Sequence, residues 1–136
     1  MLENPKVNVK IKLSALWASA TFCYLYGDYF ELYAPNKINS LITGENIMDS
    51  PTKLLIASII LAIPSLMVAF SIFLRPKINR ILNITFGTLF TLMMMFIGFA
   101  TTDDWYLFYV FLAFLESIIT ILIVWYAWKW PKEQTI

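Results

Sequence analysis

Residues 105–130 read WYLFYVFLAFLESIITILIVWYAWKW, an uninterrupted apolar run that decides the fold class. Its charged residues are Glu116, near the centre, and Lys129, near the end. Crossing the hydrocarbon core of a bilayer takes about 20 helical residues. Lipid also leaves no water to satisfy a free backbone N–H or C=O group. A continuous run of this length, without strand-like alternation, therefore predicts a transmembrane helix.

Three further apolar segments precede it, at about residues 11–33, 53–74 and 78–100. Proline, serine and aspartate lie between the segments, where they are typical of helix ends and turns. We therefore predict an all-α fold, a polytopic membrane four-helix bundle that forms a single domain over residues 1–136. No cleavable signal peptide is expected, because the first segment contains acids and lacks a small-residue cleavage site.

The longest connection is expected at residues 35–52. Within it, Ile38, Leu41 and Ile42 have helical spacing and Gly44 follows them, which predicts a short interfacial helix. The remaining connections are expected to be tight turns.

The composition supports a membrane location and excludes several other classes of protein. Hydrophobic residues make up 60% of the chain and charged residues 14%, whereas soluble domains have about 45–50% and about 25%. A single cysteine, Cys23, rules out an internal disulfide framework, and the absence of histidine removes imidazole ligands and bases. We expect no metal site, cofactor or catalytic constellation, and the net charge of +1 does not favour nucleic acid as a partner.

The distribution of cations predicts the orientation of the chain. Eight cationic residues precede the first span, lie between the second and third, or follow the fourth: Lys6, Lys10, Lys12, Arg75, Lys77, Arg80, Lys129 and Lys132. The opposite side carries Lys37 and Lys53. Because cytoplasmic loops are enriched in lysine and arginine, both termini are expected in the cytoplasm and residues 35–52 outside. The predicted localisation is a cell membrane, crossed several times.

Small and polar residues at helical spacing mark faces on which helices pack in lipid. One such row is predicted on each of the two middle spans: Ser58, Ala62, Ser65 and Ala69 on the first, and Asn83, Gly87, Thr91 and Gly98 on the second.

Three carboxylates within the spans are the strongest functional signal. A charge at the bilayer centre costs at least about 2.5–3.5 kcal/mol. At about 1.5 Å per residue, Glu116 and Pro64 lie at roughly the same depth, Asp28 about one turn closer to the outside, and Glu31 near the interface.

Aromatic and hydroxyl side chains share the faces that carry these acids, and together they predict an acidic, aromatic-walled cavity in the outer half of the bundle. The candidate binding residues are Tyr24, Asp28, Glu31, Pro64, Tyr109, Glu116 and Thr120. Glu116 is expected either to be neutral or to pair with a bound cation. In a purely structural alternative, Glu116 as a neutral acid donates a hydrogen bond to the Ile60 carbonyl that Pro64 leaves free, and Asp28 forms a hydrogen bond with an aromatic side chain.

Two stretches, Leu25-Tyr26-Gly27-Asp28-Tyr29-Phe30-Glu31-Leu32-Tyr33-Ala34-Pro35 and Ile123-Val124-Trp125-Tyr126-Ala127-Trp128-Lys129-Trp130-Pro131, carry a family resemblance. With Ile63-Pro64 and Phe114-Leu115-Glu116, the chain resembles an uncharacterised family of bacterial four-helix membrane proteins, domain of unknown function 6326. The resemblance implies four spans in a bacterial inner membrane, with Asp28, Pro35, Pro64 and Glu116 at matching positions. It implies no activity.

Three functions remain open at this point. The first is a small membrane protein whose cavity binds or transports a proton, a cation or a lipophilic molecule. The second is a structural or accessory subunit, which would pack in a homodimer or larger membrane complex by its aromatic faces. The third is an enzyme acting on a lipid or quinone by carboxylate acid–base chemistry, for which no nucleophile or metal ligand is found.

Overall fold

The computed structural model describes residues 1–132, and every regular element in that range is helical. The elements follow in the order α1 (Val9–Glu31), α2 (Lys37–Thr43), α3 (Pro51–Phe73), α4 (Pro76–Ala100), a 3₁₀ turn η1 (Asp104–Tyr106) and α5 (Leu107–Trp128). The all-α prediction is confirmed, and each of the four long helices begins within two residues of its predicted start. The first two residues predicted for the last helix belong to η1.

The predicted start and stop residues perform these roles. The Ser50 hydroxyl accepts a hydrogen bond from the Lys53 amide, and Pro51 follows as the first helical residue of α3. Gly44 ends α2 with φ of +79°, a conformation that glycine adopts without strain. The Asp103 carboxylate accepts from the Trp105 amide at 2.9 Å and begins η1. Local hydrogen bonding therefore fixes the turns that the residue types predict.

Three of the four long helices are long and apolar enough to cross a membrane: α3, α4, and the η1–α5 segment over Asp104–Trp128. These helices indicate a membrane protein. The first predicted span forms a helix at its expected place, but α1 is not among the three. It carries Lys10 and Lys12 near one end and Asp28 and Glu31 near the other.

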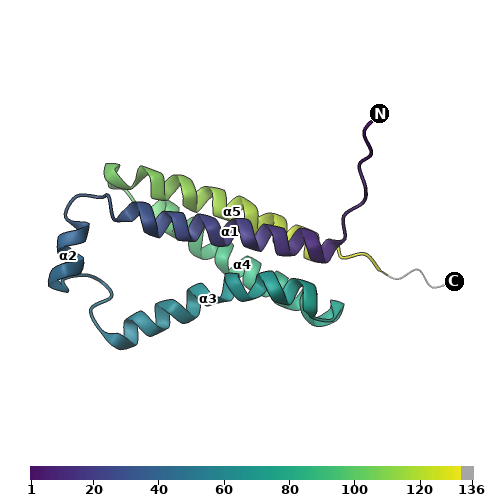
Figure 1. The fold of residues 1–136 in the computed structure, drawn as a ribbon, viewed down its shortest axis with the longest axis horizontal. Coiled ribbons are helices and arrows are strands. Elements are labelled where there is room, and N and C mark those ends of the chain that lie inside the picture. The colour runs from purple at the N-terminus through teal and green to yellow at the C-terminus, as the bar shows by residue number, and fades with distance from the viewer. Residues whose placement is uncertain (133–136) are drawn as a thin grey trace.

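The helices pack as an open arrangement and not as four equal neighbours. α5 packs against both α1 and α4, and α1 packs against α3. α1 and α5 run side by side along most of their length, and residues 1–8 and 129–132 leave the helices at the same end (Figure 1). The buried core lies where α1, α4 and α5 meet and includes Trp17, Phe90 and Ile123.

The predicted packing face of α4 is buried, with Asn83, Gly87, Thr91 and Gly98 all inside. The predicted row on α3 is wrong as an internal contact: Ser58, Ala62, Ser65 and Ala69 are exposed. Burial on α3 is confined to Pro64, Met67 and Ser71, all in its second half. Its first half slants away from α1 and α5 (Figure 1).

A polar network joins three helices at the end where the termini lie. The Trp17 indole donates to Asn83 Oδ1 at 2.7 Å, and Asn83 Nδ2 donates to Asn79 Oδ1. The Asn79 amide in turn donates to the Ser71 carbonyl at 2.7 Å, so that α1, α3 and α4 are linked. This network fastens the second half of α3 and leaves its first half free to splay.

Candidate functional site

The divergence of α3 leaves a cavity of about 570 Å³ at the end of the helices opposite the termini. Its walls come from all four long helices and from α2. Most of the lining is apolar, and the polar exceptions include Tyr24, Asp28, Glu31, Lys37, Asn46, Ser58, Tyr109 and Glu116. Five of the seven candidate residues from the sequence therefore share one cavity.

Glu116 is the buried acid of this cavity. It lies in the middle of α5 and is only 4% exposed. Its carboxyl group makes no hydrogen bond or ion pair with any residue of the described range 1–132. α5 therefore places in the cavity lining a carboxyl group that has no protein partner.

Tyr24 lines the same cavity from α1 and is 9% exposed. Its ring packs on Phe90 of α4, with the ring centres 5.8 Å apart. The Tyr24 hydroxyl is the one fully buried side-chain polar atom in residues 1–132 that has no hydrogen-bond partner. Buried polar groups are hydrogen-bonded in the great majority of cases, so this hydroxyl marks a place where a partner is missing.

Asp28 lies one turn beyond Tyr24 on α1 and is more exposed, because the first half of α3 does not cover it. The purely structural alternative, a hydrogen bond from an aromatic side chain to Asp28, is not found within residues 1–132. Tyr109, from α5, completes the aromatic part of the wall near Gly27, where α1 and α5 approach closely.

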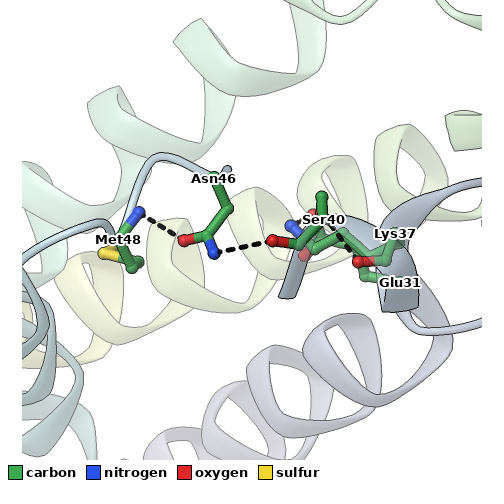
Figure 2. Close-up of polar contacts among 5 residues, drawn as sticks. All are labelled: Glu31, Lys37, Ser40, Asn46 and Met48. Carbon is green, nitrogen blue, oxygen red and sulfur yellow. Dashed lines mark hydrogen bonds and ion pairs between the residues drawn. The ribbon is translucent and has the colours of Figure 1, made fainter. Parts of the chain in front are cut away.

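An ion pair stands at the mouth of the cavity. Lys37, the first residue of α2, donates to Glu31 at the end of α1 with a distance of 2.8 Å (Figure 2). This hydrogen bond raises the pKa of Lys37 above its ordinary value. The charge of Glu31 is therefore matched, whereas no cation in residues 1–132 pairs with Asp28 or Glu116.

The connection between α2 and α3 is folded back over this mouth. The Asn46 amide donates to the Ser40 carbonyl at 3.3 Å and its oxygen accepts from the Met48 amide at 2.8 Å (Figure 2). Asn46, Ile47 and Met48 line the cavity as a result. Asn46 thus holds the loop in the conformation that covers the mouth of the cavity.

Two candidate residues lie outside the cavity lining. The Thr120 hydroxyl accepts from Thr91 at 2.6 Å and donates to the Glu116 carbonyl of its own helix at 3.0 Å, which makes it a contact between α4 and α5. Pro64 is buried in the second half of α3, one turn below Ile60 and Leu61, which do line the cavity. No hydrogen bond joins Glu116 to the Ile60 carbonyl in the described residues.

Besides Ser58, which was predicted to pack against a helix, Lys37 and Asn46 are the polar lining residues that are not among the candidate binding residues. Both belong to the outer connection, whose path depends on the positive φ of Asn36 (+65°) just before α2. An asparagine followed by a lysine in a loop is too common a pattern to indicate a cavity mouth.

A scan against protein families matches this chain over residues 3–136 with the family described as a family of unknown function, DUF6326. The chain belongs to this family. Comparison with curated proteins and with solved structures finds no match. Membership of DUF6326 confirms the expected family and leaves the function to be argued from the cavity.

Proposed function

We propose that this member of DUF6326 is an integral membrane protein with four spans that binds a lipophilic small molecule in the cavity. The observation that carries the proposal is a space of about 570 Å³ with mostly apolar walls, in which buried polar groups lack protein partners. Ligand sites of about 300–1,000 Å³ are usually apolar, with a few polar groups that fix orientation. Uptake or transport of the bound molecule, or of a proton or cation with it, would use the same site.

The orientation that we propose has both termini in the cytoplasm and the cavity in the outer half of the membrane. At the end of the bundle where α1 begins and α5 ends, cationic side chains lie over aromatic rings: Lys12 over Tyr126, Arg80 over Trp128, and Lys129 over Trp125. Basic residues with an aromatic belt are typical of the cytoplasmic interface.

Cysteine labelling tests this orientation. In a Cys23→Ser background, we expect a membrane-impermeant thiol reagent applied to intact cells to label Glu45→Cys and not Asn4→Cys. Labelling of Asn4→Cys alone would reverse the proposed topology.

Filling the cavity tests the proposed binding. Leu61 lines the cavity from the exposed first half of α3 and is not part of the buried core, so Leu61→Trp should fill the space without disturbing the core. We expect N-phenyl-1-naphthylamine to bind the protein in lipid nanodiscs saturably, and Leu61→Trp to weaken this binding at least tenfold. Fluorescence titration against empty nanodiscs measures it.

Leu55→Trp is the matched control, since Leu55 lies on the same half of α3 and outside the lining. It should leave the affinity unchanged. If the probe partitions equally into empty and protein-containing nanodiscs, the binding proposal is wrong.

The exposed row on α3 favours an assembly role as the second candidate. Ala62, Ser65 and Ala69, which lie outside the cavity lining, would let a second copy approach closely, as small residues do between membrane helices. In that case Ala62→Leu with Ala69→Leu should convert a dimer to a monomer in native-nanodisc mass measurements, and Leu61→Trp should have no effect.

A further inference from the structure

The charges of the cavity are not balanced. Three carboxylates line it, Asp28, Glu31 and Glu116, and the one lining cation among residues 1–132 is Lys37. Lys37 is already paired with Glu31 at the mouth. Asp28, which is more exposed, and Glu116, which is buried, therefore line the cavity without an ion-pair partner.

The surroundings of Glu116 make this imbalance costly. Apolar side chains that include Ile60, Leu61 and Met94 line the same cavity, and Glu116 is only 4% exposed. An unsatisfied buried polar group costs about 1–3 kcal/mol, and more when it is charged. A ligand that supplies a positive charge and N–H donors would remove this cost.

We propose that the ligand of the cavity is a lipophilic amine, bound as its ammonium ion. The ammonium donates to the Glu116 carboxylate, with Asp28 adding attraction, and the rings of Tyr24 and Tyr109 provide the faces that cations favour. The Tyr24 hydroxyl, which lacks a partner, accepts a further N–H. The apolar tail lies along the walls supplied by α3 and α4. This inference rests on the proposed function, because it names the class of molecule that the same cavity binds.

Other ligand classes fit these observations less well. An inorganic cation needs several oxygen ligands together, and residues 1–132 contain no group of three acidic or cysteine side chains arranged to hold a metal. A neutral lipophile would leave the Glu116 carboxyl unmatched. An anion would be repelled by both unpaired carboxylates.

Three molecules that share a tail and differ in charge test the inference. Equilibrium dialysis of decylamine, decanol and decanoate is carried out at pH 7 with protein-containing and with empty nanodiscs. The difference between the two gives the saturable binding of each molecule to the protein. We expect decylamine to bind at least tenfold more tightly than decanol, and decanoate not to bind saturably. Glu116→Gln should abolish the preference for the amine and change decanol binding by less than about twofold.

The control is Glu45→Gln, which removes a glutamate that is exposed and outside the lining, and which should keep the preference. If Glu116→Gln does not fold, Asp28→Asn at the more exposed position should weaken decylamine several-fold and spare decanol.

Saturable binding of decanol as tight as that of decylamine, or an amine preference that persists in Glu116→Gln, would overturn the inference and leave the proposed function standing. Absence of saturable binding by all three molecules would overturn both.

Discussion

Replacing Asn83 by leucine is expected to destabilise the protein by about 1–3 kcal/mol, which is the cost of leaving a buried donor unsatisfied. Asn83 Oδ1 accepts from the Trp17 indole at 2.7 Å and from the Ser71 hydroxyl at 3.4 Å. Trp17 and Asn83 are both 0% exposed, so the indole N–H cannot reach water when its acceptor is lost. Interhelical hydrogen bonds in membranes average only about 0.6 kcal/mol, and we expect more here because one amide connects three helices. Thermal unfolding in nanodiscs measures the effect.

A double-mutant cycle identifies the origin of this loss. In a Trp17→Phe background the donor is absent, so Asn83→Leu should cost less than half of what it costs in the wild type. Asn39→Leu makes the same change on the exposed face of α2 and should be close to neutral. An equal cost in both backgrounds would show that Asn83 does not act through Trp17.

The faces of α4 could be predicted from the sequence because polar residues in an apolar helix have few alternatives. An asparagine side chain cannot satisfy both its amide and its carbonyl oxygen within its own helix, so Asn83 has to face a neighbour. The same reasoning fails for α3, since a serine hydroxyl can bond within its own helix. Ser58 donates to the Leu54 carbonyl at 2.8 Å, so its hydroxyl needs no partner on a neighbouring helix and the residue lines the open cavity instead of a helix contact.

The acids of the site could also be found from the sequence, whereas the shape of the cavity could not. Asp28 and Glu116 stand out because carboxylates are rare in apolar spans. Their common cavity depends on where α3 leaves α1, and this is set by contacts such as the bond from the Ser14 hydroxyl to the Val68 carbonyl. The Lys37–Glu31 pair depends on a turn of five residues, whose path the local residue types do not determine.

Gly87→Ala is expected to destabilise the protein by about 1–3 kcal/mol, a typical cost of overpacking a well-packed interface. A Cβ atom at Gly87 would lie 2.8 Å from Val124 Cγ2 and 3.3 Å from Ile123 Cγ2, both on α5. Both neighbours are β-branched and have few alternative rotamers in a helix. The helices α4 and α5 would have to separate at the point where the Thr91–Thr120 hydrogen bond joins them. The measurement is again the thermal unfolding midpoint in nanodiscs.

The control must remove the helix-forming gain that any glycine-to-alanine change brings, about 1 kcal/mol in a helix interior. Gly27→Ala provides it, because the added Cβ would meet Leu112 Cδ1 at 3.5 Å, an ordinary contact. Gly27→Ala should therefore be neutral or stabilising, and the difference between the two variants measures packing alone. Equal effects at Gly27 and Gly87 would mean that α4 and α5 can move apart freely, and that the wall of the cavity formed by Met94 and Glu116 is not held in a fixed shape.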